Sequence, residues 1–519
     1  MEQKVFTREA TGLVKEMSTM DAFWMNLYAN SPMVAGVFVF SLAPLLFVGG
    51  DLVIATLIAT LGTAVVGLAY CFSTATMPRS GGDYVFVSRT YHPLIGFFSS
   101  FNLSYWVFAF WGFNAFLAAT FFSRITGDLG LASVSAYAST TVGSFVVGSA
   151  ISLLEGLLMI TRLRNYLTVQ RIIAVYALII AAAVVAILLL GNGHFPTAFN
   201  NYVTSHNLMN SSDPYNTVIQ TAANQGFHNP GFTWTATLGV VPVMWGGLLT
   251  GWWSTWVSGE MKSARSVKNQ MLAIIGSVLV CGLILGAIAF ALVSTVGYTF
   301  FGSLATSVGS FPGLTASYDF YVRVLSPYVI FIDLGFFLSC LLFIPLDILF
   351  TTRSMFAWSF DRLVPAKLSE ISDRFHTPVI SIIISLIIAE FLIYLFAFTN
   401  AVSLYAATTF GVLLTYFITA SAVTVFPYVK KDMYDKSPAK RSVGGIPVMT
   451  IVGILSMLFL IFMTYYYITV PGLAGLSLIT VETVVGLFIV STVIYFASRM
   501  YHKSKGIDLD MVFKEIPPE

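Results

Sequence analysis

Long apolar runs separated by short polar segments dominate the chain. Each run has about 20 residues or more, the length that an α-helix needs to cross about 30 Å of hydrocarbon. The pattern therefore predicts twelve membrane-spanning helices. They cover residues 20–48, 52–77, 93–123, 138–160, 167–190, 235–258, 269–295, 327–358, 379–398, 401–427, 448–470 and 474–498.

The longest polar interval, residues 191–234, divides the first ten spans into two sets of five. We therefore expect six regions along the chain. These are an N-terminal tail (1–19), a first repeat (20–190), an extracellular loop (191–234), a second repeat (235–428), two further helices (429–498) and a C-terminal tail (499–519). A second outer segment, Gly297 to Tyr321, mixes aromatic, Gly, Pro and hydroxyl residues, which indicates either a re-entrant or surface-lying lid or an ordinary loop.

The first span of each set is interrupted. Residues 30–32 (Asn-Ser-Pro), followed by Gly36, interrupt the first set, and the stretch VMWGGLLTGWW (residues 243–253) interrupts the second. Proline removes a backbone donor and glycine lowers helix propensity, so both weaken a helix locally. Each interruption by itself is compatible with a kink or close helix packing. Interruptions at matching places in two halves indicate a transporter site built on inverted repeats.

A helix that breaks inside a membrane exposes main-chain N–H and C=O groups, which are tolerated there only where they line a cavity. The half-helix after the break begins with unpaired N–H groups and positive dipole, which suit a carboxylate. The half-helix before it ends with carbonyls, which suit an ammonium group or a cation. Two facing breaks would therefore fit a zwitterion.

Composition agrees with a membrane protein. Of the 519 residues, 57% are hydrophobic and 10% charged, and the mean hydropathy is +0.83. Cytoplasmic loops collect Lys and Arg. With the N-terminus inside, 24 of the 26 Lys and Arg residues fall on inner segments, and only Arg124 and Arg323 fall outside. We therefore expect a multi-pass protein of the cell membrane with both termini in the cytoplasm.

The remaining polar chemistry excludes several classes. Cys71, Cys281 and Cys340 all lie in predicted spans, so neither a disulfide framework nor a thiolate metal cluster is expected. The histidines form no metal-ligand set, and no cofactor or nucleic-acid partner is expected. A phosphate-binding loop GxxxxGK[ST] is absent from the sequence, which gives ATP-driven transport no support. Converging nucleophile, base or metal ligands are missing too, so an enzyme is not expected.

Acidic residues inside spans cost about 2.5–3.5 kcal/mol each at mid-membrane and are functional candidates. Five such residues occur: Glu155, Asp333, Asp347, Glu390 and Glu482. Asp347 is the candidate for proton exchange, with a structural charge or an interhelical hydrogen bond as the alternative. We expect Asp333 to be partly solvated, and Glu390 and Glu482 to serve the scaffold or a subunit contact. Asp51 is predicted to cap the second span.

Four segments resemble the amino acid, polyamine and organocation transporter superfamily. MPRSGGDYVFVSRTYHPLIGF (residues 77–97) is similar to its loop between spans two and three, and TTRSMFAWSFDRLVPAKL (351–368) to its pattern after span eight. SGEMKSARSVKNQM (258–271) resembles its segment after span six, and MVAGVF (33–38) its first-helix motif IGAGIF. The resemblance runs from about residue 20 to about residue 430. Val34, Ala264 and Arg362 depart from the family pattern.

The resemblance implies an all-α integral membrane fold of 12 helices, with five-plus-five inverted repeats and discontinuous helices 1 and 6. It also implies a site at the breaks, where main-chain N–H groups meet the carboxylate and carbonyls meet the amine. The residues concerned are Ser31, Pro32, Met33, Val34, Ala35, Gly36, Leu248, Leu249, Thr250 and Gly251, with Asn102, Tyr105, Trp252 and Tyr405 as side-chain candidates that could equally be packing residues.

The family's ion or proton site lies between spans one and eight, which implies Asp347 and Thr351 as coupling residues. On the inner face, a gate of ion pairs that break on opening is the hypothesis, with solvated loop charges as the alternative. The gate residues are Arg79, Asp83, Glu260, Lys262, Arg353 and Asp361.

These observations together predict a secondary transporter that moves an amino acid or related small amine-containing solute by alternating access. A coupling proton or sodium ion and membrane lipid are the expected partners, and the sequence leaves open which ion is used. A polyamine or organic cation transporter, or an exchanger, is the near alternative. A cationic substrate ranks below a neutral amino acid because it would need more pocket carboxylates than the predicted core offers. A solute-sensing receptor on the same scaffold is the alternative from a different class.

Overall fold

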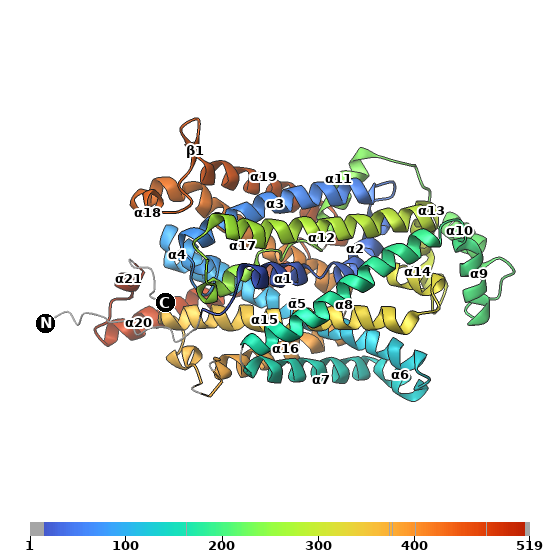
Figure 1. The fold of residues 1–519 in the computed structure, drawn as a ribbon, viewed down its shortest axis with the longest axis horizontal. Coiled ribbons are helices and arrows are strands. Elements are labelled where there is room, and N and C mark those ends of the chain that lie inside the picture. Colours follow the sequence, from blue (N-terminus) through green and yellow to red (C-terminus); the bar gives the residue numbers. More distant parts are fainter. Residues whose placement is uncertain are drawn as a thin grey trace.

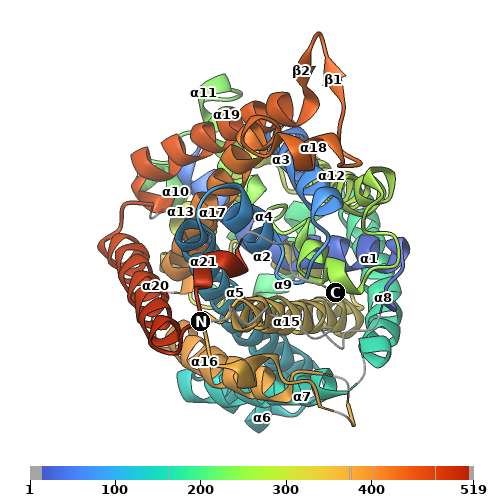
Figure 2. The same cartoon turned by 90° about the vertical axis from the view of Figure 1, so that its left-hand side faces the viewer.

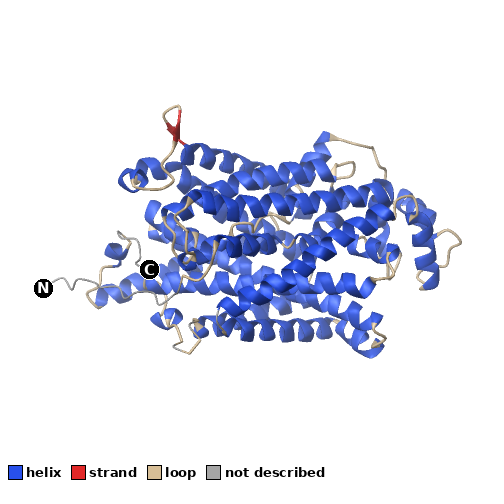
Figure 3. Ribbon diagram, in the orientation of Figure 1, coloured by secondary structure: helices blue, strands red, loops and turns tan. Residues whose placement is uncertain are grey.

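The protein is a bundle of long helices that run along its longest axis (Figure 1). The computed structural model describes residues 15–161, 163–372, 374–375, 377–399, 401–473 and 475–513. Figure 3 shows that these are almost entirely helical apart from one small hairpin. The helices α18 (Lys431–Asp435) and α21 (Leu509–Val512) lie at the left of Figure 1, the side that we call the N-terminal end, and the right-hand side is the far end.

The elements follow one another without long irregular stretches. The α-helices are α1 (Thr19–Asn30), α2 (Pro32–Leu46), α3 (Leu52–Thr76), α4 (Asp83–Thr90), α5 (Pro93–Asp128), α6 (Ala132–Ala138), α7 (Thr141–Ile160), α8 (Leu163–Leu190), α9 (Phe195–Ser205), α10 (Pro214–Asn224), α11 (Trp234–Trp245), α12 (Val267–Val296), α13 (Tyr298–Ser307), α14 (Tyr318–Leu325), α15 (Val329–Phe360), α16 (Val379–Phe398), α17 (Ala401–Val429), α18 (Lys431–Asp435), α19 (Val448–Thr469), α20 (Leu478–Ser504) and α21 (Leu509–Val512). The 3-10 helices are η1 (Trp253–Glu260), η2 (Val308–Ser310), η3 (Ala366–Ser369) and η4 (Pro471–Leu473), and the antiparallel strands are β1 (Ser442–Val443) and β2 (Ile446–Pro447).

Eleven helical segments of the described chain are long and apolar enough to cross a membrane, with α1 and α2 counted together as one segment. They match eleven of the twelve predicted spans. The remaining one, residues 235–258, contains the shorter apolar helix α11 and the 3-10 helix η1. The chain is thus a multi-pass membrane protein, and the count of twelve spans stays a prediction.

Local sequence sets where the first helices begin. Ser18 and Asp21 form a reciprocal capping box at the start of α1. Asp51 caps α3, because its carboxylate accepts hydrogen bonds from the N–H groups of Val53 and Ile54, each at 2.8 Å. The predicted capping role of Asp51 is confirmed.

Helices from the two predicted sets pack on one another. Along the chain, α3 packs on α12, α5 on α15, and α7 on α16. Figure 2, which looks along the bundle from the N-terminal end, shows α15 near the centre and α19 and α20 at the periphery. The long central pair α5 and α15 therefore carries the region where the interrupted segments lie.

Short helices cover the far end (Figure 1). The predicted loop 191–234 contains α9 and α10, two helices that its polar composition did not indicate. The segment Gly297–Tyr321 contains α13, η2 and the start of α14. Of these, α13 and α14 both pack against α2, so this segment lies on the far-end half of the first interrupted span rather than loosely on the surface.

Candidate functional site

The first interruption separates α1 from α2 at a single residue. Ser31 has φ 40° and ψ 64°, a left-handed conformation that is rare for a residue with a side chain. Pro32 then begins α2, where its missing N–H is not needed. Ser31 makes no side-chain capping bond to α2, so the N–H groups of its first turn face the break unprotected by a cap.

The second interruption is longer. After α11 the chain runs through turns from Gly246 to Trp252 before η1 begins. Main-chain hydrogen bonds here join residues three positions apart, from Gly247 N to Met244 O at 3.1 Å and from Leu248 N to Trp245 O at 2.8 Å, instead of the four positions of an α-helix. The three glycines of this stretch favour such a departure from the α-helix.

The two interruptions lie against each other. Asn30 Oδ1 accepts hydrogen bonds from both the N–H and the hydroxyl of Thr250, each at 3.1 Å, and the same hydroxyl also donates to the Ala29 carbonyl. One turn earlier, Asn26 accepts from the N–H of Ser254 at 2.8 Å and donates to its hydroxyl at 2.9 Å. Two asparagines of α1 therefore hold the second interrupted segment in place.

A small cavity of about 20 Å³ lies at this junction. Such a volume holds about one water molecule. Its lining comes from α1, α2, α5, the second interruption and α15, and consists of Ala29, Asn30, Ser31, Val34, Ala35, Phe110, Phe113, Asn114, Gly246, Thr250 and Phe343. The cavity therefore lies at the two interruptions, where the sequence predicts a solute site, and in this conformation its volume is much smaller than that of a solute.

Two amide groups of the lining keep unused hydrogen-bonding capacity. Thr250 fixes the carbonyl side of Asn30, and Asn30 Nδ2 is buried without a partner among the described residues. Asn114 Nδ2 donates to the Phe110 carbonyl at 2.9 Å, and Asn114 Oδ1 is buried without a partner in the same part of the chain. Two residues of the lining thus carry one unpaired donor and one unpaired acceptor among the described residues, and a buried polar atom without a partner is costly unless a ligand completes it.

Of the sequence-predicted binding residues, the structure places four on the cavity: Ser31, Val34, Ala35 and Thr250. Seven others are close to these in the sequence but do not line the cavity: Pro32, Met33, Gly36, Leu248, Leu249, Gly251 and Trp252. The Leu249 carbonyl accepts a 2.8 Å bond from the Tyr416 hydroxyl, and the Trp252 ring stacks on Tyr70 at 5.0 Å. The Leu249 carbonyl and the Trp252 ring are therefore engaged in contacts with other parts of the protein.

The predicted side chains on α5 make contacts within the protein. Asn102 donates to the Gly411 carbonyl and the Thr415 hydroxyl and accepts from Trp106, at 3.1–3.2 Å. Tyr105 packs edge-on against Trp106. The side chain of Tyr405 lies outside the described residues. Contact of these three with a solute stays a prediction.

Sequence reasoning missed Asn114 and the phenylalanines of the lining. Asn114 had a usable signal, because it is an uncharged polar residue in an apolar span. Phe110, Phe113 and Phe343 had none, because phenylalanine is abundant along the whole chain, with 45 residues. Only the packing of α5 and α15 around the break selects these three.

Asp347 lies on α15, one turn from Phe343 of the cavity. It is 0% exposed, and neither carboxylate oxygen has a hydrogen-bond partner among the described residues. The nearby Thr351 hydroxyl donates to Asp347's own main-chain carbonyl at 2.8 Å and contacts Ser385 at 3.2 Å. The alternative of a permanently paired structural charge at Asp347 therefore has no support in the described chain.

The predicted gate charges at the N-terminal end are buried rather than solvated, so that alternative is wrong for four of them: Asp83, Glu260, Arg353 and Asp361. Arg353 holds Glu260 through two bonds of 2.9 and 3.0 Å. Asp361 is held by Arg89 through two bonds of 2.6 and 2.8 Å. Two bidentate pairs thus fasten α15 to η1 and to α4.

Three of the gate candidates, Asp83, Arg79 and Lys262, do not belong to these two bidentate pairs. The Asp83 carboxylate accepts from the hydroxyls of Thr419 at 2.7 Å and Tyr70 at 3.1 Å. Burial raises the pKa of Asp83 to about 6, and these hydrogen bonds partly oppose the rise. The Arg79 guanidinium donates to the Pro78 carbonyl, and the Lys262 side chain is exposed.

Asp333 corrects another expectation. It is fully buried at the far end and paired with Arg323, so the prediction of a partly solvated carboxylate is wrong. The pairing follows from α14, which brings Arg323 over the start of α15, and no span-by-span reading of the sequence places these two helices together.

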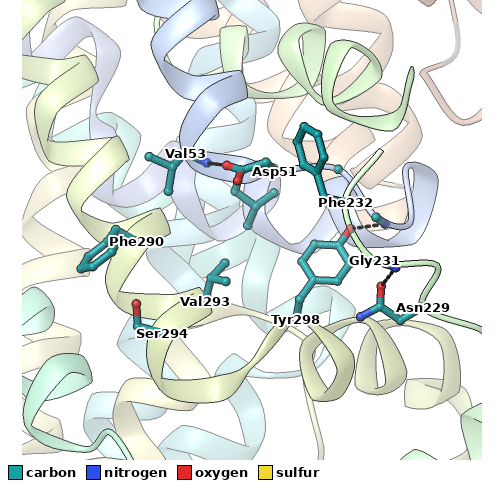
Figure 4. A pocket seen from close by; sticks show the side chains of 12 residues that line it. Asp51, Val53, Asn229, Gly231, Phe232, Phe290, Val293, Ser294 and Tyr298 are labelled. Atoms are coloured by element: carbon teal, nitrogen blue, oxygen red, sulfur yellow. Dashed lines mark hydrogen bonds between the residues drawn. The ribbon is translucent and has the colours of Figure 1, made fainter. Parts of the chain in front are cut away.

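A larger cavity of about 310 Å³ lies at the far end, between the start of α3 and the end of α12 (Figure 4). Asp51, Phe232, Phe290 and Tyr298 are among its lining residues. Its polar groups already serve the backbone, because Asp51 caps α3 and the Tyr298 hydroxyl donates to the Phe47 carbonyl at 2.9 Å. Among the described residues that line it, no buried side-chain polar atom lacks a partner, in contrast to the small cavity.

A comparison with protein families found a match, whereas a comparison with individual curated proteins did not. A search of curated proteins found no match. The family model described as amino acid permease matches residues 17–493, a range that contains both interruptions, the cavity and both groups of ion pairs. The chain therefore belongs to the amino acid permease family of the amino acid, polyamine and organocation transporter superfamily.

Proposed function

We propose that this permease is a secondary active transporter that moves a neutral amino acid by alternating access. Family membership supports a transporter for amino acids or related solutes. The observation that carries the finer proposal is the junction of the two interruptions, where Asn30 and Asn114 line one cavity and Asn30 Nδ2 and Asn114 Oδ1 have no partner among the described residues. A zwitterion supplies the complementary acceptor and donor.

The half-helix ends add to this complementarity. The first turn of α2 presents uncapped N–H groups and positive dipole, which favour the carboxylate together with Asn30 Nδ2. The last turn of α1 presents carbonyls, and neither Lys nor Arg lies in that turn. These carbonyls and Asn114 Oδ1 favour the ammonium group.

The absence of charge in the lining argues for a neutral solute. All eleven residues that line the cavity are uncharged. A polyamine or another organic cation needs carboxylates to offset its desolvation, and Asp347 lies outside this lining. A neutral amino acid is therefore the better fit.

The packing supports the proposal of two inverted repeats of five helices. Helices of the same rank in the two sets pack together in three cases, α3 with α12, α5 with α15, and α7 with α16. The first-ranked segments meet as well, because α1 contacts η1 and α2 contacts α11. Such pairing is what a two-fold relation between the sets produces, and it provides two related halves that can move against each other.

Several contacts link the elements at the N-terminal side of the bundle. Glu260 is paired with Arg353, and Asp21 of α1 with Arg171 of α8. Main-chain bonds of 3.0 Å link Met17 to Glu260 and to Lys262. We infer that these contacts form the cytoplasmic gate, in a cell-membrane protein with both termini in the cytoplasm, and that they break when the site opens inward.

We propose that Asp347 couples transport to a proton or a sodium ion. Its buried carboxylate lacks a partner in the described chain and lies one helical turn from the cavity. Either ion would neutralise it, which makes loading of the ion and of the solute mutually favourable.

Uptake into reconstituted vesicles tests the proposal. A panel of labelled neutral amino acids is offered under an imposed pH or sodium gradient, with spermidine and other amines as competitors. We expect one or more amino acids to accumulate against their gradient, with amines competing weakly. Uptake that ignores both gradients would overturn the coupling, and transport of amines alone would overturn the solute class.

A further inference from the structure

The segment between α12 and α15 sends one tyrosine onto the first interruption. The Tyr318 hydroxyl, at the start of α14, donates a 2.6 Å hydrogen bond to the Met33 carbonyl in the first turn of α2. The side chain of Tyr318 is 0% exposed. A residue of a far-end helix thus reaches the turn that, with Ser31 and Val34, forms one wall of the cavity.

The Tyr318 ring fills the space between α2 and α15. A Cβ atom added to Gly36 would lie 2.9 Å from the ring, so a glycine at this position is what permits the approach. The ring packs edge-on against Phe40 of α2, with ring centres 5.6 Å apart, and against Phe336 of α15 at 5.4 Å. Tyr318 therefore lies between these two helices and packs against both.

Ion pairs beside Tyr318 hold α14 in this position. Asp319, the next residue, is paired with Arg124 of α5. One turn further along both helices the charges are reversed, and Arg323 of α14 holds Asp128 of α5 through bonds of 2.8 and 2.9 Å. Arg323 also holds Asp333 of α15. Ion pairs thus fasten α14 to both central helices. If α5 and α15 move, all the pairs are kept only when α14 moves with them.

We propose that Tyr318 is the gate residue that closes the solute site from the far end, and that the crossed ion pairs of α14 with α5 and α15 hold this gate shut. The proposal rests on the proposed transport function, which requires the far end to open for the solute. It adds to that function a specific gate residue and the ion pairs, here called the lock, that hold the gate shut. Opening moves α14 away, breaks the Tyr318–Met33 bond and exposes the α2–α15 space.

A reporter cysteine tests the gate without any solute. Ser339 lies on α15 one turn beyond Phe336, and its hydroxyl contacts the Met33 sulfur at 3.9 Å. Ser339→Cys is made in a chain in which Cys71, Cys281 and Cys340 are replaced, and its reaction rate with a bulky maleimide is measured in lipid nanodiscs. Labelling then reports how often the space under Tyr318 opens.

The variant Tyr318→Phe removes only the bond to Met33, so we expect about three- to tenfold faster labelling, the effect of one net hydrogen bond. Tyr321→Phe is the matched control. Tyr321 lies on the same helix and is equally buried, but its hydroxyl has no partner among the described residues. Its labelling rate should stay within about twofold of the parent. Equal rates for the two phenylalanine variants would overturn the proposal.

The lock is tested by charge. Arg124→Ala leaves Asp319 buried and unpaired, which should release α14 and raise labelling beyond the Tyr318→Phe level. The exchange of both charges, Arg124→Asp with Asp319→Arg, should return the rate toward the parent. Slow labelling of a folded Arg124→Ala protein would overturn the lock, and if that variant fails to fold, the comparison of the two phenylalanine variants decides. Uptake without these labelling effects would refute the gate alone, whereas the labelling effects without uptake would refute the transport function alone.

Discussion

Asn30 and Thr250 are joined by two hydrogen bonds of 3.1 Å, although 220 positions separate them in the sequence. The acceptor is one side-chain oxygen, and the donors are the main-chain N–H and the hydroxyl of Thr250. This contact links the two interrupted segments and leaves the amide nitrogen of Asn30 buried without a partner among the described residues. The shape of the candidate site therefore depends on it.

Thr250→Val should weaken solute binding. It removes the hydroxyl bonds to Asn30 and Ala29 but keeps the main-chain bond. A net loss of about 0.5–1.5 kcal/mol per hydrogen bond corresponds to a dissociation constant about three- to tenfold higher or more. The control is Thr56→Val on α3, because the buried Thr56 hydroxyl bonds only within its own helix, to the Leu52 carbonyl at 2.6 Å. Equal losses measured by equilibrium binding would contradict a special role for Thr250.

Asn114→Asp should change which solutes are accepted. The substitution keeps an acceptor at the cavity and adds a negative charge, so it should favour amines without a carboxylate over amino acids, whereas Asn114→Leu should weaken both. Selectivity is measured as the ratio of amine to amino acid uptake. Asn102→Asp serves as the control, since Asn102 is fully bonded to α17 and Trp106. If both aspartates shift selectivity alike, Asn114 is not the ammonium acceptor.

Asp347→Asn should abolish gradient-driven uptake and leave solute exchange largely intact. The side chain keeps its size but can no longer be neutralised by a proton or a sodium ion. Counterflow and driven uptake are compared in the same vesicles. Glu482→Gln on α20, an exposed position, should change neither activity. Driven uptake at the parental rate would remove Asp347 from the coupling step.

Glu260→Gln should destabilise the closed N-terminal end. It leaves Arg353 buried and unpaired, which costs about 3–5 kcal/mol for a buried pair, and the exchange of both charges should recover part of the loss. Asp435→Asn breaks the exposed pair with Lys440, where we expect about 1 kcal/mol or less. Thermal unfolding in detergent measures both. A smaller effect at Glu260 than at Asp435 would contradict the buried clamp.

Asp83 should make stability fall between about pH 4 and pH 6. Burial raises its pKa to about 6 from 3.8, so over this interval the unfolded chain releases the proton while the folded protein still holds it. The free energy of unfolding therefore decreases as the pH rises, by an amount on the order of 3 kcal/mol, and becomes level above pH 6. Asp83→Asn keeps an acceptor for Thr419 and Tyr70 and should flatten this part of the profile. An unchanged profile of melting temperature against pH would assign the slope to other groups.

Several properties were predictable from the sequence because they depend on local chemistry. Apolar run length located eleven long membrane helices, since a membrane helix must satisfy its backbone within one segment. The cap at Asp51 and the helix break at Ser31 followed from short stretches of residues, as did the turns after Gly246. Family membership followed from motifs that keep their spacing along the chain.

Other properties depend on which helices meet. Asn102 and Asn114 are both asparagines in the same apolar helix, α5, and only the packing of that helix turns Asn114 to the cavity and Asn102 to α17. The burial of the gate charges and of Asp333 was missed for the same reason, because a charge near a span end looks solvated until its partner on another helix is known.

The sequence by itself determined the membrane helices and where two of them break, because hydrogen bonding inside a helix is a short-range property. Tertiary structure alone decided that the breaks meet through Asn30 and Thr250, that Asp347 lacks a partner among the described residues, and that Tyr318 covers Gly36. These contacts join residues that lie far apart in the chain, and their strength depends on exclusion from water, which only the packed bundle provides.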